Sequence, residues 1–167
     1  MVAGMMAAEA GMPLGWTFYI AVEDTDALAA KAAELGAKVI VPPTDIPDTG
    51  RFSILIDPQG AALAVLQPLT GGSGGAFDQK KSGHGNWHDL ASLDAQAAAG
   101  FYGALFGCTV TRSVPMGSDM TYHIFATQGQ DIGGFFNASG APGWCVYFGT
   151  PSAKAAGAPR SRARADR

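Results

Sequence analysis

The chain has 167 residues, of which 47% are hydrophobic and 15% are charged. This length fits one globular domain or two small modules and excludes a large multidomain enzyme. No apolar run approaches the roughly 18 residues of a membrane-spanning helix, and no Lys or Arg precedes the apolar N-terminus as in a signal peptide. We therefore expect a cytoplasmic protein without a membrane partner, in which Cys108 and Cys145 are buried thiols rather than a disulfide.

Charge is distributed unevenly along the chain. Residues 1–153 hold six basic and 13 acidic groups, whereas residues 154–167 hold five basic groups and one acidic group. The negative body argues against a nucleic-acid partner for the folded part. Residues 151–167 are rich in Ala, Arg, Pro, Gly and Ser without a hydrophobic period, so we expect a disordered basic tail. An arm that contacts nucleic acid or an anionic membrane stays open as the functional alternative for this tail.

The first half of the chain predicts the order strand, helix, strand, strand, strand. Alternation over residues 17–22 indicates a half-buried strand. Asp24 is a helix N-cap, and good helix formers follow it up to Gly36, a natural C-cap. Turn residues and the pair Pro42-Pro43 separate the later strands. The expected helix covers residues 26–35, and these strands cover 38–41, 51–56 and 61–66.

The second half repeats the same order after a break in composition. Residues 70–85 are rich in Gly and Ser, as in a flexible linker. Asp94 and Gly107 then bound a second predicted helix. The expected helix covers residues 95–106, and the strands cover 87–92, 109–114, 120–126 and 131–136.

A longer repeat relates the two ends of the chain. Residues 2–6 are similar to 132–136, and each segment is followed by a loop and a Trp-x-x-Tyr-apolar sequence, at 16–20 and 144–148. The chain therefore begins and ends at equivalent points of one repeating unit. We expect an extra strand at each end, at residues 2–6 and 144–149.

Several segments together form a recognisable pattern: 16–24, 34–36 and 50–60, then 87–90, Asp94, 101–102 and 105–107. They resemble the vicinal oxygen chelate superfamily, also called the glyoxalase, bleomycin-resistance and extradiol-dioxygenase superfamily. The likeness covers residues 2–150 and is greatest to bacterial two-domain glyoxalase-like proteins, in which four modules form two clefts. On this resemblance, the chain matches the second and third modules.

The resemblance implies an α+β fold of two βαβββ modules, whose mixed, curled sheets form a glyoxalase-like cleft, plus an extra strand at each end. The chain then divides into a stray strand and loop (1–15), a first module (16–69), a linker (70–85), a second module (86–137), the first strand of a following module (138–150) and the tail (151–167).

The resemblance also implies a divalent metal, held by a residue of each module's first strand and one of its last strand. The matching first-strand positions are Thr17 and Trp87, and the last-strand positions are Ala64 and a residue within 132–134. None supplies the imidazole or carboxylate that such metals take, so we expect no metal and no cofactor. Asp89 is two residues after Trp87 and should therefore point into the cleft on the same side of the strand, whereas His88 between them should point toward the helix.

The histidines and a turn aspartate have plainer interpretations. His84 and His88 are four residues apart, but Gly85 and Asn86 between them argue against a helical zinc pair. We expect His88 to be partly buried and His123 to face solvent or an interface. Asp57 of the Asp-Pro-Gln-Gly segment should anchor a turn.

The expected ligand-binding residues of the cleft are Thr17, Tyr19, Trp87, Asp89 and Tyr122. Small residues leave room beside them: Ala21, Ala62, Ala64 and Ala91. An aromatic lining suits a small, partly apolar or planar organic molecule bound by stacking. The main hypothesis is a metal-free small-molecule-binding protein of the resembled superfamily, with no catalytic residue assigned.

Two alternatives stay open. One is a metal-dependent lyase or dioxygenase of glyoxalase type, with Asp89 as ligand or base. The other is a fragment without activity of its own.

A single module leaves its concave face open, so the modules must pair with each other or with a second chain. A homodimer formed by module pairing or strand exchange is therefore an expected assembly.

Overall fold

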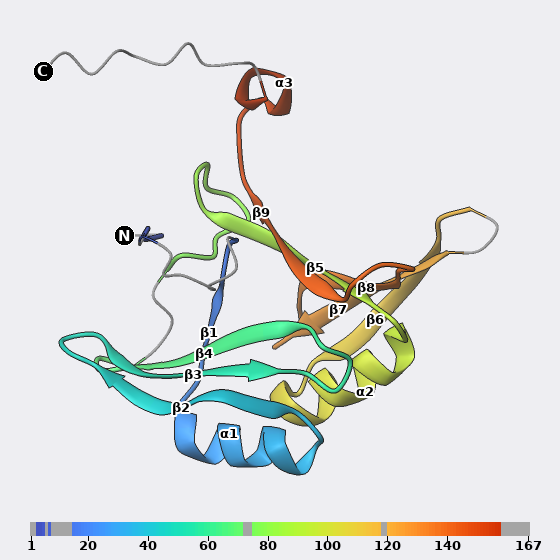
Figure 1. The fold of residues 1–167 in the computed structure, drawn as a ribbon. Helices are drawn as coiled ribbons and strands as arrows, with labels where there is room; N and C mark the ends of the chain where they lie inside the picture. Colours follow the sequence, from blue (N-terminus) through green and yellow to red (C-terminus); the bar gives the residue numbers. More distant parts are fainter. Residues whose placement is uncertain (1–2, 6, 8–14, 72–74, 118–119, 158–167) are drawn as a thin grey trace, which may run out of the picture.

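The computed structural model describes residues 3–5, 7, 15–71, 75–117 and 120–157, which form two sheets and three helices (Figure 1). The first sheet has the order β1 (Tyr19–Ala21), β4 (Ala62–Pro68), β3 (Gly50–Ile56) and β2 (Lys38–Ile46). The second has the order β6 (Thr109–Pro115), β7 (Thr121–Thr127), β8 (Gln130–Asn137), β5 (Gly85–Ser92) and β9 (Gly143–Phe148). The helices are α1 (Thr25–Glu34), α2 (Ala95–Phe106) and α3 (Ala153–Ala156).

The two modules share one topology. β1 runs parallel to β4 with Tyr19 opposite Ala64, and β5 runs parallel to β8 with Asp89 opposite Gly134. All other strand pairs are antiparallel, and β9 joins the second sheet beside β5. The α+β fold with two curled, mixed sheets is therefore confirmed, and so is the strand predicted at 144–149, to within one residue at each end.

The two main helices begin and end at the predicted capping residues. The Asp24 carboxylate accepts the N–H of Ala27 at 2.9 Å, and Asp94 caps α2 in the same way. Gly107 ends α2 in the left-handed conformation, with φ of 73°. In the part of the chain that the structure describes, no helix is long and apolar enough to cross a membrane.

One buried core joins the two modules. On the side of each sheet that carries its helix, Leu63 and Val65 of β4 and Leu90 of β5 are at most 1% exposed. They belong to a single cluster with residues of both helices, including Ala32 and Tyr102. Because the helix-bearing sides share this core, the opposite side of each sheet lies outside it. We call that side the outer face of the sheet.

A buried hydrogen-bond chain fixes the contact between the modules. Asp57, which is 4% exposed, accepts the N–H groups of Gln59 (2.9 Å) and Ala61 (2.8 Å), so its predicted turn role is confirmed. Its other oxygen accepts the hydroxyl of Tyr102 on α2 at 2.9 Å, and Trp144 Nε1 donates to that hydroxyl at 3.1 Å. Burial, followed by the negative charge of Asp57, raises the pKa of Tyr102, which keeps this phenol protonated as a donor.

The side chain of Gln59 makes a second connection between the modules. Its amide oxygen accepts the N–H of Asp94 at 2.7 Å, and its amide nitrogen donates to the carbonyl oxygen of Asp94 at 2.8 Å. The turn after β3 is thereby attached to the first residue before α2.

β2 is longer than the sequence predicts. Pro42 and Pro43 were expected to end the strand at Val41, yet it continues to Ile46. The register against β3 shifts on both sides of Val41. Because β2 is the edge of its sheet, the prolines fall where the strand bulges and no further strand needs their missing N–H groups.

The predicted flexible linker makes defined contacts in its described second half. The ring of Phe77 stacks on His88 with centroids 5.2 Å apart. The Gln79 amide donates to the carbonyl oxygen of Asp131 at 2.8 Å. Residues 75–84 therefore pack against the second sheet, because an aromatic ring and an amide in this segment find partners there, while residues 72–74 lie outside the described residues.

The predictions for the two ends need correction. Residues 3–5 form no strand, because each is exposed and none pairs with a neighbouring strand, while the remaining residues of the predicted strand, 2 and 6, lie outside the described residues. Residues 151–157, expected to be disordered, contain α3, since the Ser152 hydroxyl accepts the N–H of Ala155 at 3.2 Å. The rest of the predicted tail, 158–167, lies outside the described residues.

The prediction of two buried thiols is wrong for Cys145. Cys108 is half-buried, and burial raises its pKa. Cys145 is exposed, because it lies on the outer face of β9 at the edge of the second sheet.

The substitution Tyr102→Phe tests the contact between the modules. It removes the hydroxyl between Asp57 and Trp144 and leaves two polar groups without their partner. We expect the free energy of unfolding in urea to fall by about 1–3 kcal/mol. The control Tyr19→Phe, in a side chain that is 48% exposed, should change it by less than about 0.5 kcal/mol. Equal losses from both variants would contradict the role given to Tyr102.

Candidate functional site

β5 brings two functional side chains to the outer face of the second sheet. Leu90 and Ser92 are buried in the core, and His88 packs against Phe18 on the same side. Residues of the opposite parity, Trp87 and Asp89, therefore point to the outer face.

Asp89 is the centre of four side chains, which we call the Asp89 cluster: Trp87, Asp89, Tyr122 and Tyr147. Trp87 Nε1 lies 3.1 Å from Asp89 Oδ1 and 2.6 Å from Tyr122 Oη, so its N–H donates to both oxygens. The Tyr122 hydroxyl donates to the same Oδ1. The Tyr147 hydroxyl donates to Asp89 Oδ2 at 2.8 Å. One carboxylate thus accepts hydrogen bonds from three strands, β5, β7 and β9.

Strand register explains why these residues meet. On β9, Tyr147 is opposite Trp87, next to the pair of Cys145 and Asp89. On the other side of β5, Asp89 is opposite Gly134 of β8. Tyr122 on β7 reaches across that glycine, and a Cβ at position 134 would overlap its ring. Glycine at this position therefore lets a phenol two strands away reach the carboxylate.

The two phenols of the cluster stay protonated at neutral pH. Burial, together with the hydrogen bond to Asp89, raises the pKa of Tyr122. The hydrogen bond to Asp89 is the main cause that raises the pKa of Tyr147 to about 12. Both hydroxyls consequently act as hydrogen-bond donors and not as bases.

Three of the residues predicted to line a ligand site, Trp87, Asp89 and Tyr122, are brought together here. Tyr147 was missed, although the repeat in the sequence aligns it with Tyr19, which was selected. The segment 144–149 was interpreted only as the start of a following module. Its pairing with β5 places it in the second sheet.

The other predicted lining residues lie elsewhere. Tyr19 belongs to the first sheet, where its ring packs against Phe52 with centroids 6.4 Å apart. Among the described residues, no hydrogen bond or ring contact joins Thr17 or Tyr19 to the Asp89 cluster. Thr17 and Tyr19 are separate from the cluster because the two sheets share a core on their helix-bearing sides. The outer face of the first sheet and that of the second sheet therefore do not form one site. Of the small residues, Ala91 lies on β5 beside the cluster, whereas the others expected to leave room are in the first module: Ala21, Ala62 and Ala64.

The side chains at the metal positions implied by the resemblance do not fit a divalent metal. Thr17, Ala64 and Trp87 carry no carboxylate or imidazole, and the register identifies Gly134 as the fourth position. Within the described ranges, no group of three or more His, Cys, Asp and Glu side chains could hold a metal ion. Asp89 itself is surrounded by aromatic donors.

The histidines lie outside this cluster. His88 is partly buried between Phe18 and Phe77, as expected, and this burial lowers its pKa. The Nδ1 atom of His84 lies 3.2 Å from the carbonyl oxygen of Ser82. His123 is 2.8 Å from the Ser113 hydroxyl through its Nδ1.

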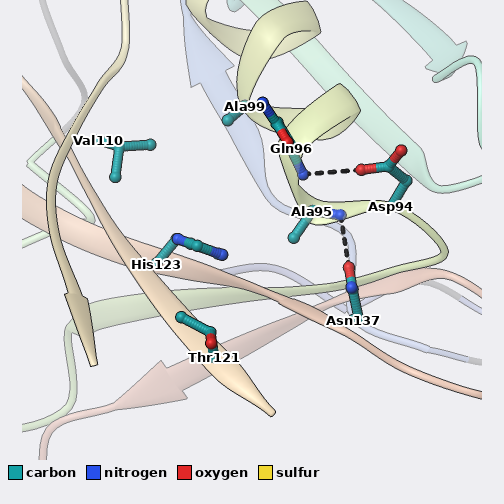
Figure 2. Close-up of a pocket in the computed structure, with 8 residues that line it drawn as sticks. All are labelled: Asp94, Ala95, Gln96, Ala99, Val110, Thr121, His123 and Asn137. Carbon is teal, nitrogen blue, oxygen red and sulfur yellow. Dashed lines mark hydrogen bonds between the residues drawn. The ribbon is translucent and has the colours of Figure 1, made fainter. Parts of the chain in front are cut away.

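A surface hollow of about 460 Å³ lies between the start of α2 and strands β6 and β7. Figure 2 shows His123 pointing into it from β7. On its helix side, Asp94 accepts the backbone N–H of Gln96 and Asn137 accepts that of Ala95 (Figure 2). This hollow is on the helix-bearing side, away from the Asp89 cluster.

Fold and site together define a class of protein: a βαβββ repeat with mixed sheets and a polar aromatic cluster on one sheet face. A family model described as Glyoxalase/Bleomycin resistance protein/Dioxygenase superfamily matches residues 7–65. A solved variant of homoprotocatechuate 2,3-dioxygenase from B. fuscum has a similar fold, with a TM-score of 0.50 and 14% identity over 68% of this chain and 33% of that chain.

Two curated relatives are more similar in sequence. "Putative glyoxylase CFP32" from Mycobacterium tuberculosis is 34% identical over 90% of this chain and 58% of its own length. "Anthracycline biosynthesis protein DnrV" from Streptomyces peucetius is 35% identical over 83% of this chain and 50% of its own length. The chain belongs to the glyoxalase/bleomycin resistance protein/dioxygenase superfamily, and it spans between half and three-fifths of the length of these relatives.

The substitution Gly134→Ala tests how the cluster is built. The added methyl group would overlap the ring of Tyr122, so the ring must leave Asp89 and the indole of Trp87 must lose one acceptor. We expect a shift in tryptophan fluorescence and a lower melting temperature. Gly143→Ala on β9 is the matched control, because a Cβ there meets no atom within 4 Å. Unchanged fluorescence in Gly134→Ala would contradict the described packing.

Proposed function

We propose that the protein binds a small, planar, partly apolar organic molecule on the outer face of the second sheet, without a metal ion. The observation that carries this proposal is the Asp89 cluster, in which three aromatic side chains and one carboxylate converge on that face. Aromatic surface with a few fixed polar groups suits a flat organic ligand, because stacking supplies affinity and hydrogen bonds supply orientation.

The surroundings of the cluster support this class of ligand. Phe136 stacks beside Tyr122 with centroids 6.3 Å apart, and it lies opposite Ala91 on the neighbouring strand. A flat aromatic surface is therefore adjacent to a small side chain on the outer face of the sheet. Tyr147 is 46% exposed, so that part of its ring is open to a ligand.

The donor set supports binding without a metal. Asp89 is held by three hydrogen-bond donors, and the family's metal positions in this chain carry side chains that are poor ligands. In this proposal Asp89 is a hydrogen-bond acceptor for the ligand rather than part of a metal centre.

A relative's name points to the same chemical class. DnrV is named for anthracycline biosynthesis, and anthracyclines contain a planar polycyclic aromatic ring system. This name supports the choice of a flat aromatic probe.

We further propose that a second βαβββ surface covers the bound ligand. An open sheet face binds a small molecule weakly, and a second copy of the chain, paired by module or by strand exchange, would bury both the ligand and the exposed aromatic surface. We propose that this assembly is cytoplasmic.

The test uses two probes with the same carbon skeleton, one planar and aromatic and the other saturated: 2-naphthylmethanol and decahydro-2-naphthylmethanol. We expect the planar probe to bind more tightly in calorimetric titrations. Trp87→Leu should weaken its binding by about two- to tenfold, whereas the control Trp16→Leu should not. Equal affinity for both probes, or equal effects of both variants, would contradict the proposed site. Stoichiometric metal in purified protein would contradict the metal-free part.

A further inference from the structure

We propose that the Asp89 cluster selects ligands that carry an organic ammonium group next to their planar ring. This inference rests on the proposed function and specifies the chemical class of its ligand. Its starting point is the charge of Asp89, which the described part of the protein leaves without a positive partner.

The described ion pairs involve other carboxylates. Arg51 pairs with Asp26 (2.6 Å) and Asp45 (2.9 Å), and Lys81 pairs with Asp78 (3.3 Å). All three donors to Asp89 are instead neutral groups: one indole N–H and two phenol O–H groups. They stabilise the carboxylate and hold it in place, but they leave its full negative charge at the surface of the sheet.

The hydrogen bonds also leave one acceptor position unused. An ionised carboxylate has about four lone-pair sites on its two oxygens. Trp87 and Tyr122 both donate to Oδ1, whereas Oδ2 accepts, among the residues that the structure describes, from Tyr147 alone. The remaining position is on Oδ2, the oxygen that is hydrogen-bonded to the half-exposed Tyr147. An N–H of an ammonium group would complete it with a charge-assisted hydrogen bond.

The aromatic neighbours can add to the attraction of a cation bound at Asp89. Indole and phenol rings carry negative potential on their faces and attract ammonium groups within about 6 Å of the ring centroid. Trp87, Tyr122 and Tyr147 all have a polar atom within hydrogen-bond distance of Asp89. Their N–H and O–H groups point at the carboxylate, so a cation would meet the ring faces only from the open side of the sheet, where the charge of Asp89 attracts a cation and repels an anion.

The charge of residues 1–153 acts in the same direction. Residues 1–153 hold six basic and 13 acidic groups. A net negative surface raises the local concentration of cations and lowers that of anions, and this effect weakens as salt is added.

The experiment compares 2-naphthylmethylammonium with its neutral counterpart 2-naphthylmethanol at pH 7, where the amine is charged. Both probes have the same planar ring and nearly the same size. We expect the ammonium probe to bind about tenfold more tightly at low salt, and we expect added salt to reduce this preference. The readout is the ratio of the two dissociation constants from calorimetry.

Two variants assign the preference to one carboxylate. Asp89→Asn removes the charge while keeping a side chain of the same shape, and it should reduce the ratio to about one. Asp48→Asn is the matched control with the same change in net charge; it lies at a turn with φ of 56°, which asparagine adopts readily, and it should keep the ratio. Unfolding curves of both variants establish that they are folded.

The outcomes separate this inference from the proposed function. If both probes bind wild-type protein with equal affinity, the selection of ammonium is refuted while the planar site stands. If neither probe binds, both proposals fail. If the preference is the same in wild type, Asp89→Asn and Asp48→Asn, the cation is recognised elsewhere and the inference is wrong.

Discussion

The buried hydrogen bond between Asp57 and Tyr102 is the contact on which the arrangement of the molecule depends. It attaches the turn after β3 to α2, and Trp144 of β9 donates to the same phenol oxygen. Because these bonds form within the shared core, the helix-bearing sides of both modules are turned inward. The outer faces of the sheets then stay outside this core.

The same strand that fixes the core also completes the site. In β9, Trp144 points inward to Tyr102, and Tyr147 points outward to Asp89. An added strand beside β5 therefore supplies both a core aromatic residue and a donor of the Asp89 cluster. Gly134 allows Tyr122 to reach the same carboxylate from the other direction. The cluster is a consequence of how four neighbouring strands are ordered in the sheet.

Local sequence patterns predict two residues of the Asp89 cluster, but they do not predict how the strands bring the other residues to it. Asp94 is recognisable in the sequence as the cap that begins α2, and strand alternation before it puts Trp87 and Asp89 on one face. Both features follow from the sequence alone. The contribution of Tyr147 depends on β9 pairing with β5, and the separation of Tyr19 from the cluster depends on which faces share a core. Both are long-range packing choices that hydrophobic periodicity does not specify.

The central claim is that planar ligands bind at the Asp89 cluster, and one nuclear magnetic resonance titration tests it most directly. The chain has three tryptophans, whose indole N–H signals report three places: Trp16 near Phe148, Trp87 in the cluster and Trp144 in the core. On addition of 2-naphthylmethanol, the account predicts that the Trp87 signal moves and the Trp144 signal does not. Movement of Trp144 or Trp16 with an unchanged Trp87 signal would contradict it.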